Sequence, residues 1–204
     1  MLDIIVSIIL GYLLGSIPWA LIIGLIFFNK DIRNYGSGNL GGSNAGRVLG
    51  KKIGLLVIAL DALKAFFVVM FAATILKNPT AASVAGIFAC IGHCYPLFAK
   101  FKGGKGVATI LGFNLALTLF VTGEFLVLFL APALIFIITI CLTKIVSLSS
   151  MLWLLSVCYF NYLVNGLELT TIILIMLWIF VVYRHKENII KIINKKENKV
   201  SWIK

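Results

Sequence analysis

Two glycine-rich segments of the chain carry the residue types that hold phosphate. The first, residues 35–47, contains five glycines, two serines and two asparagines and ends on Arg47. Glycine lets the backbone curve around an anion, so that several N–H groups and hydroxyls face it. A flexible linker is the alternative, but a linker needs neither an arginine nor asparagines. We predict that this segment, called the glycine-rich loop below, binds a phosphate group.

The second segment, residues 92–109, joins His93 and Pro96 to the run Gly-Gly-Lys-Gly at residues 103–106. We call this run the glycine–lysine segment. It leads directly into an apolar stretch that favours a helix, and the first N–H groups of a helix have no partner within the helix. Lys105 beside such a helix start predicts a second anion site.

Neither segment fits a nucleotide-binding motif. Residues 36–41 match the pattern G-x-G-x-x-G, but that motif needs a strand before it in a soluble βαβ unit. An apolar run precedes it here. In the glycine–lysine segment, Gly106 stands where a Walker A loop has serine or threonine, and no glycine lies five residues before Gly104. Nucleotide binding is therefore disfavoured.

His93 lies between Cys90 and Cys94. These three could share one helix face as zinc ligands, but zinc would need a fourth ligand, and such cysteines more often pack as small apolar residues. Beside a phosphate-type segment, a substrate contact or acid–base role for His93 is favoured over a simple helix cap. Asp61 and Lys64, three residues apart in an apolar run, are interpreted as a mutually neutralising pair without a catalytic role.

A basic tail offers a third set of polar residues. His185, Glu187 and Asn188 follow the last apolar run, and from the residues alone a solvated tail explains them equally well. The isoleucines that follow recur at roughly helical spacing among lysines, which is typical of a helix lying on anionic lipid.

The elements that position these residues are membrane helices. The chain has 204 residues, of which 61% are hydrophobic and only 12% charged, and its mean hydropathy of +1.09 lies outside the range of soluble domains. A spanning helix needs about 20 apolar residues. We predict a single all-α integral membrane domain over residues 1–204, with a kink or close packing at Gly15–Pro18 and a hairpin at Gly123–Glu124. Its seven predicted spans are residues 4–28, 53–76, 81–98, 106–122, 125–143, 146–164 and 169–183.

Charge predicts how these spans are oriented. The formal net charge is +11, and every lysine and arginine except Lys64 and Lys77 falls on one side of the seven-span arrangement. The positive-inside rule then places the N-terminus outside and the C-terminus in the cytoplasm. Both glycine-rich segments and the tail would face the cytoplasm together.

The acids on that face exclude one class of reaction. Only Asp31, Glu187 and Glu197 provide carboxylates there, whereas metal-dependent phosphotransfer needs several clustered carboxylates. Lysine, arginine, asparagine and backbone N–H groups instead suit two anionic substrates and a developing oxyanion. Acyl transfer involving phosphate fits this composition.

The catalytic dyad of the common glycerolipid acyltransferases is absent. That dyad separates histidine from aspartate by four residues, but Phe98 holds this place after His93, and Ile190 holds it after His185. The spacing suggests no Ser-His-Asp arrangement either, so we expect the substrate's own hydroxyl to be the nucleophile.

Taken together, the two segments and the tail resemble the three signature motifs of the bacterial acyl-phosphate:glycerol-3-phosphate acyltransferase family. The resemblance covers nearly the whole chain, and residues 92–109 carry its longest and most specific part. Ser43 stands where the family usually has threonine, which keeps the hydroxyl. The remaining matching runs are Leu-Leu-Gly-Ser-Ile at 13–17, Leu-Asp-Ala-Leu-Lys at 60–64, Val-Ser-Leu at 146–148 and Arg-His-Lys-Glu-Asn-Ile at 184–189.

The resemblance implies a multi-pass enzyme of the bacterial inner membrane with its active site on the cytoplasmic side. It implies transfer of a fatty acyl group from acyl phosphate to glycerol 3-phosphate, giving 1-acylglycerol 3-phosphate and inorganic phosphate, the first acylation of phospholipid synthesis. No metal, cofactor or nucleic acid is expected. The implied partners are the two substrates, membrane lipids and a soluble enzyme that makes acyl phosphate.

The same resemblance implies the site residues. The expected catalytic residues are Ser37, Arg47, His93 and Lys105. The expected substrate-binding residues are Gly38, Asn39, Gly41, Ser43, Asn44, Gly103, Gly104, His185 and Asn188.

The expected mechanism is direct transfer without a covalent acyl-enzyme. Arg47 and Lys105 would hold the two phosphates, and either His93 or the glycerol phosphate itself would accept the hydroxyl proton. A transporter for an organic phosphate anion is the rival interpretation. Transporter sites usually lie near the midplane between repeats, whereas these polar residues gather on one face and no repeat is visible.

Overall fold

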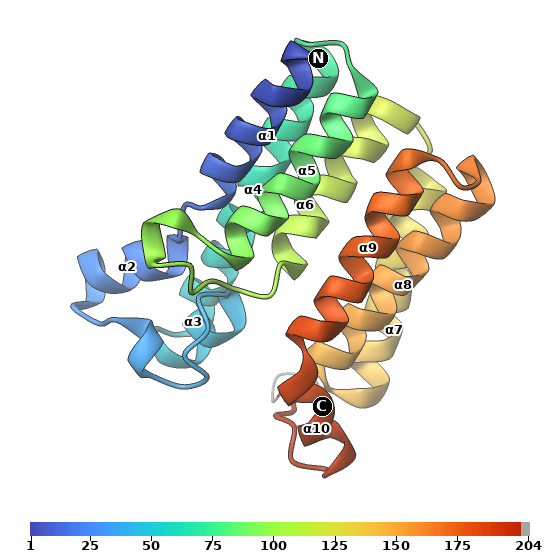
Figure 1. Cartoon of the computed structure of the whole chain (residues 1–204). Coiled ribbons are helices and arrows are strands. Elements are labelled where there is room, and N and C mark those ends of the chain that lie inside the picture. The colour runs from blue at the N-terminus through green and yellow to red at the C-terminus, as the bar shows by residue number, and fades with distance from the viewer. Residues whose placement is uncertain (201–204) are drawn as a thin grey trace. The chain divides into compact units, whose positions relative to one another are not determined.

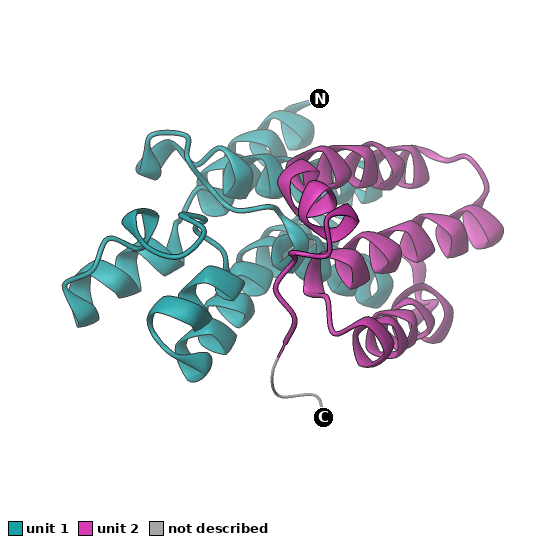
Figure 2. Cartoon of the chain, turned by 90° about the horizontal axis from the view of Figure 1, so that it is seen from below, with its two compact units in different colours: residues 1–121 teal, residues 122–204 magenta. Residues whose placement is uncertain are grey.

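The structure is a computed structural model that describes residues 1–200. Helices and the loops between them make up this range, and no strand occurs within it, so the predicted all-α membrane fold is confirmed. Lys204, which the charge pattern assigns to the cytoplasmic side, lies outside the described residues. The chain divides into two compact units, residues 1–121 and 122–204 (Figure 2). The single domain expected over residues 1–204 stays a prediction.

The first unit contains four longer helices and a set of short ones. The longer helices α1, α4, α5 and α6 run side by side, while α2, α3 and the connecting loops gather at one end of them (Figure 1). Its elements are α1 (Leu2–Gly15), α2 (Trp19–Phe28), η1 (Ile32–Asn34), α3 (Gly42–Val48), α4 (Lys51–Thr74), α5 (Pro79–Cys94), η2 (Leu97–Ala99), α6 (Val107–Leu117) and the π-helical turn η3 (Thr118–Thr122).

The break predicted in the first apolar run is confirmed. Helix α1 ends at Gly15, and α2 begins at Trp19 with Pro18 at its N-cap. Proline has no N–H to continue the helical ladder, so the chain turns there. Gly15 also packs so closely on Ala89 of α5 that a side chain would overlap its carbonyl. The residues predicted to kink or pack closely do both.

Glycine sets a second close approach, between α4 and α6. A Cβ atom on Gly112 of α6 would overlap the carbonyl oxygen of Ala62 in α4. Small residues let two membrane helices approach until their backbones touch, which gains van der Waals contact in a medium without a hydrophobic driving force. The pairing of α4 with α6 therefore depends on this glycine.

Replacing Gly112 by alanine is expected to lower the thermal stability of the purified protein, because overpacking of this kind typically costs about 1–3 kcal/mol. The measurement is the midpoint of thermal unfolding in detergent. Gly46→Ala is the matched control, since its new Cβ would lie 3.6 Å from Gly54 Cα, an ordinary contact. Equal midpoints for the two variants would contradict the proposed backbone contact between α4 and α6.

The second unit is a three-helix arrangement with a terminal helix. Helix α8 packs against both α7 and α9, and α10 bends away from α9 by 59°. The backbone N–H of Val200 donates to the carbonyl oxygen of Lys144 over 2.8 Å, which ties the end of the described chain to the turn after α7. Its elements are η4 (Leu126–Leu130, π-helical), α7 (Ala131–Thr143), α8 (Val146–Asn165), α9 (Leu169–Arg184) and α10 (Lys186–Ile193).

Each predicted span contains helix, but the spans differ in length. Within residues 1–200, five stretches are long and apolar enough to cross a membrane, or six if α9 and its bent continuation α10 count as one span. Residues 107–122 form a shorter apolar helix, and Gly123–Glu124, where a hairpin is predicted, lies beside the boundary between the units. The long stretches are Leu2–Phe28, Lys51–Thr74, Pro79–Ala99, Leu126–Thr143 and Val146–Asn165. The count of seven and the orientation of the termini stay predictions.

Candidate functional site

The glycine-rich loop is a packed structure rather than a linker. Ile32 just before the loop, Leu40 within it and Ala45 of α3 are almost fully buried in one apolar cluster, which also takes in Leu21 of α2 and Ala99 of η2. This cluster joins the first basic loop to the segment that leads into the glycine–lysine segment. Both loops therefore lie at the same end of the first unit.

Asn44 holds the curve of the glycine-rich loop. Its Oδ1 accepts a hydrogen bond from the N–H of Ser37 over 2.8 Å, and its Nδ2 donates to the carbonyls of Ile32 and Tyr35 over 3.2 and 3.1 Å. Both amide hydrogens are used within the protein, and the side chain is almost fully buried. Asn44 thus shapes the loop, while its predicted contact with substrate stays untested.

Glycine is required at defined places in this loop. Gly36 and Gly38 have φ angles of +60° and +68°, which side chains rarely adopt. At Gly36 a Cβ would also overlap Asn44 Oδ1. The loop consequently presents Ser37 at an exposed position and Asn39 at a half-buried one.

Arg33 precedes the glycine-rich loop and Arg47 ends it, and the two side chains differ in their surroundings. Arg33 makes a bidentate ion pair with Asp31, with Arg33 Nη2 2.6 Å from Asp31 Oδ2. These hydrogen bonds from the guanidinium hold the pKa of the Asp31 carboxyl below its ordinary value. Arg47 lies in the last turn of α3 with an exposed side chain, as does Ser43 in its first turn. Arg47 is therefore the better placed of the two arginines to meet an anion.

His93 lies in the last turn of α5 and is only 6% exposed. Its Nδ1 is 2.9 Å from Lys64 Nζ and 3.4 Å from Asp61 Oδ1, both in α4. Lys64 and Asp61 are themselves joined over 2.9 Å, so the neutralising pair predicted from the sequence is confirmed. Its contact with a candidate catalytic residue was not predicted.

The other ring nitrogen of His93 faces the glycine–lysine segment. A Cβ on Gly104 would overlap His93 Nε2, and the N–H of Gly104 donates to the carbonyl of His93 over 3.1 Å. Gly103 is just as constrained, since a side chain there would overlap the same carbonyl. Gly106, with a φ of +87°, caps the start of α6, and half-buried Lys105 precedes it. His93 thus lies between a buried ion pair and a predicted anion site.

His185 belongs to the second unit. It caps the end of α9, is 4% exposed, and has its Nδ1 2.8 Å from the carbonyl oxygen of Val181. A carbonyl oxygen only accepts hydrogen bonds, so Nδ1 carries the proton and Nε2 of a neutral ring is an acceptor. His185 is a buried residue at a helix junction, which a solvated tail would not provide.

Asn188 takes part in a polar cluster at the end of the second unit. Its Nδ2 donates to Glu197 Oε1 over 2.6 Å, and Ser147 Oγ donates to the same oxygen over 3.0 Å. Glu197 therefore ties the tail to the start of α8. That His185 and Asn188 join the loops of the first unit around one substrate stays a prediction.

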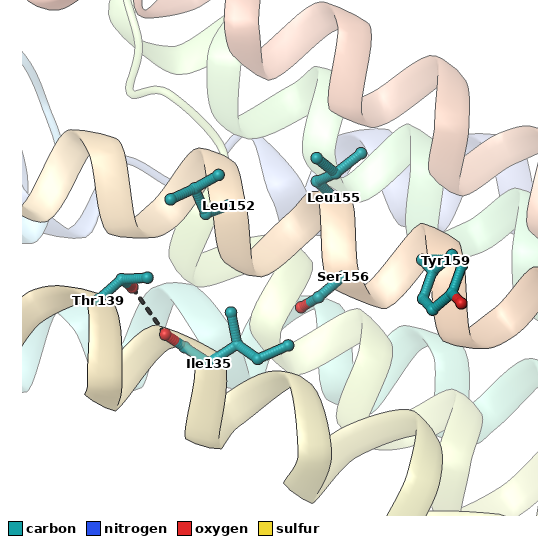
Figure 3. Close-up of a pocket in the computed structure, with 6 residues that line it drawn as sticks. All are labelled: Ile135, Thr139, Leu152, Leu155, Ser156 and Tyr159. Atoms are coloured by element: carbon teal, nitrogen blue, oxygen red, sulfur yellow. Dashed lines mark hydrogen bonds between the residues drawn. The ribbon is translucent and has the colours of Figure 1, made fainter.

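An apolar groove lies between α7 and α8 in the second unit, with a volume of about 470 Å³ (Figure 3). Two of its three hydroxyl groups are satisfied internally, since Thr139 donates to the carbonyl of Ile135 and Ser156 to that of Trp153. Such a groove suits an aliphatic chain and offers nothing to a phosphate. Its lining residues are Ile135, Thr139, Leu152, Leu155, Ser156 and Tyr159.

The alternative of a zinc ion on His93, Cys90 and Cys94 finds no support in the geometry. His93 Nδ1 is directed at the Lys64 ammonium, which is a poor neighbour for a metal ion. Within residues 1–200, no three histidine, cysteine or acidic side chains group as metal ligands would.

Sequence reasoning missed the contact of Asp61 and Lys64 with His93. Charged residues within membrane segments are rare and tend to mark function. That signal was present, but their spacing of three residues offered a sufficient structural explanation. The contact with His93 joins residues 29 positions apart, and local pattern cannot show it.

Comparisons with known proteins agree along the whole chain. A family model described as Glycerol-3-phosphate acyltransferase matches residues 5–195. The glycerol-3-phosphate acyltransferase of Bacillus subtilis (strain 168) is 46% identical over 96% of this chain and 97% of its own length. That of Staphylococcus carnosus (strain TM300) is 39% identical over 98% and 99%.

A solved structure shares the fold as well. The crystal structure of PlsY, an integral membrane glycerol 3-phosphate acyltransferase, in its glycerol 3-phosphate form matches with a TM-score of 0.87. It is 32% identical and covers 97% of this chain and 96% of that one. Sequence, family model and fold agree, and the chain belongs to the glycerol-3-phosphate acyltransferase family.

Proposed function

We propose that the protein transfers a fatty acyl group from acyl phosphate to the 1-hydroxyl of glycerol 3-phosphate. The observation that carries this proposal is the pairing of two glycine-rich, cation-bearing loops at one end of the first unit, with His93 buried beside one of them. Two phosphorylated substrates need two anion sites next to each other. The likeness to a solved acyltransferase in its glycerol 3-phosphate form supports one of these sites.

The identity of the acyl donor is inferred from the chemistry that the loop residues can perform. Acyl phosphate carries its own leaving group, so the protein needs no nucleophile, only groups that hold phosphate and stabilise an oxyanion. The hydrogen-bond donors and cations of the two loops fit that task. They are backbone N–H groups, Ser37, Asn39, Arg47 and Lys105. The acyl tail remains among the apolar helices.

The reaction balances without a covalent enzyme intermediate. The glycerol hydroxyl oxygen bonds to the acyl carbon, the bond from that carbon to the phosphate oxygen breaks, and the hydroxyl proton ends on the departing phosphate. Arg47 and Lys105 hold the two phosphates, and N–H groups of the loops stabilise the tetrahedral oxyanion. The other substrate contacts proposed are Gly38, Gly41, Ser43, Gly103, Gly104, His185 and Asn188.

The chemistry of the acyl donor suggests where the reaction takes place. A donor with a phosphate head and a fatty tail fits a site at the membrane surface, where basic loops meet the ends of apolar helices. We place the site on the cytoplasmic face of a bacterial inner membrane, where a soluble enzyme could deliver acyl phosphate.

Purified protein in detergent, given palmitoyl phosphate and glycerol 3-phosphate, is expected to release 1-palmitoylglycerol 3-phosphate and one equivalent of inorganic phosphate. The measurement is product by mass spectrometry together with phosphate release. Palmitoyl-CoA serves as the matched donor and should give no product. Product from palmitoyl-CoA alone would overturn the donor assignment, and uptake of glycerol 3-phosphate into vesicles without acylation would favour a transporter.

A further inference from the structure

The ion pair in α4 has more contacts than mutual neutralisation requires. Lys64 Nζ lies 2.9 Å from Asp61 Oδ1, 2.9 Å from His93 Nδ1 and 3.2 Å from the carbonyl oxygen of Ile17. The side chains of Lys64, Asp61 and His93 are 3%, 2% and 5% exposed. An ion pair that served only to neutralise two buried charges would not need further contacts with His93 and the carbonyl oxygen of Ile17.

The hydrogen count of the lysine decides what the histidine does. An ammonium has three N–H donors and no acceptor. Its three neighbours are a carboxylate, a carbonyl and a ring nitrogen, so each receives one hydrogen. His93 Nδ1 must then accept, and a neutral imidazole that accepts at Nδ1 carries its proton on Nε2.

That proton points toward the predicted anion site. Nε2 of His93 faces Gly104 of the glycine–lysine segment, close enough that a side chain on Gly104 would overlap it. An N–H in this position donates a hydrogen bond to an oxyanion, whereas a general base would need a lone pair there.

We propose that Asp61 and Lys64 are positioning residues that fix His93 in its Nε2–H tautomer, which makes His93 a hydrogen-bond donor to substrate phosphate and not a proton acceptor. The identity of the bound group rests on the proposed function, but the tautomer does not. Asp61 orients and neutralises the lysine, and Lys64 selects the ring nitrogen. The backbone carbonyl of Ile17 takes the third hydrogen and so fixes the direction of the other two.

The second histidine provides an internal reference. In His185 the proton lies on Nδ1, because Nδ1 donates to the carbonyl of Val181. The chain contains only these two histidines. The structure therefore assigns opposite tautomers to the two rings of one protein.

The test is a long-range proton–nitrogen NMR spectrum of the full chain, labelled with ¹⁵N-histidine and held in lipid nanodiscs. Recording it without substrate at about pH 8, above the ordinary histidine pKa, favours the neutral form of an imidazole ring. One ring is expected with its proton on Nε2 and one with its proton on Nδ1. His185→Gln should remove the second and leave the first, which assigns the Nε2–H ring to His93. A proton on Nδ1 of His93 would overturn the proposal.

Substitution of the lysine tests its role directly. In Lys64→Met, His93 is expected to turn its Nδ1 proton to Asp61, which moves the ring proton off Nε2 and lowers kcat about 100-fold, the effect of losing one oxyanion donor. In Lys64→Arg the cation remains, and the Nε2–H tautomer should persist. A Lys64→Met protein that keeps the Nε2–H ring would also overturn the proposal.

A second variant guards against simple unfolding. Lys64→Met leaves Asp61 as an unpaired buried charge, which can destabilise a protein strongly. The double variant Asp61→Leu with Lys64→Met has no buried charge, and we expect it to fold with His93 in a mixture of tautomers. A single Nε2–H form in that variant would show that the pair does not select it.

The two proposals fail separately. Protein that shows the Nε2–H ring of His93 but makes no product from acyl phosphate would contradict the proposed function and leave the positioning role standing. Active protein in which His93 carries its proton on Nδ1 would contradict the positioning role and leave the proposed function standing.

Discussion

Replacing Lys105 by methionine is expected to lower kcat/KM for acyl phosphate about 10²- to 10³-fold, as loss of one preorganised oxyanion or phosphate donor does. Lys105 is half-buried between Gly104 and Gly106, at the start of α6. A charge in that position is less screened by water than one on an open surface, so its removal costs more. Methionine keeps the length and packing of the side chain while removing the charge. The measurement is steady-state phosphate release at varied acyl phosphate.

The neighbouring lysines are the controls. Lys100 and Lys102 lie in the same loop but are exposed, so Lys102→Met should change kcat/KM by no more than about threefold, in line with the small worth of a screened surface charge. Lys105→Arg retains the charge with a different donor geometry and should fall between the two. If Lys102→Met lost as much activity as Lys105→Met, the loop would act through overall charge and not through a defined contact.

The second large effect is expected from Gly104→Ala, which should lower kcat about 100-fold, again the magnitude for one lost donor. The new methyl group would overlap His93 Nε2, and the ring cannot easily yield because its Nδ1 is held by Lys64. Gly104 does not require a positive φ, so the backbone tolerates alanine and the effect is steric. The measurements are kcat and the unfolding midpoint in the same detergent. Gly46→Ala, with ordinary contacts, should retain the unfolding midpoint.

A double-mutant cycle separates this mechanism from general damage to the loop. If Gly104→Ala acts by displacing His93, then His93→Ala should cost a similar factor, and the two changes together should cost no more than either alone. Fully additive losses would mean that Gly104 and His93 act independently.

The sequence predicts the helices of this protein well because their cause is local. An apolar run of sufficient length must form a helix in a membrane, since every backbone polar group needs a partner within the chain. Pro18 and Gly123 break such runs for reasons that also lie in the residue itself. The weakest spans are residues 107–122 and 169–184, because these helical stretches are shorter than the five long ones and length alone does not decide.

The loops were predictable in character but not in detail. Glycine content and cations at residues 35–47 and 103–106 indicate anion binding from the sequence alone. The side-chain amide of Asn44 hydrogen-bonds to the loop backbone because of the way α3 packs, and no local sequence pattern indicates that packing. The same holds for Lys64 and His93, which lie on different helices and meet only because α4 and α5 are neighbours.

The break between α1 and α2 leaves the Ile17 carbonyl where Lys64 can reach it. The orientation of one imidazole is thereby tied to three separate parts of the first unit, through Ile17, α4 and α5. Moving the glycine-rich loop and the glycine–lysine segment onto another helical scaffold would transfer their glycines and cations but not this orientation. The two loops alone would therefore not reproduce the site on another scaffold. A designed protein would also need the break between α1 and α2.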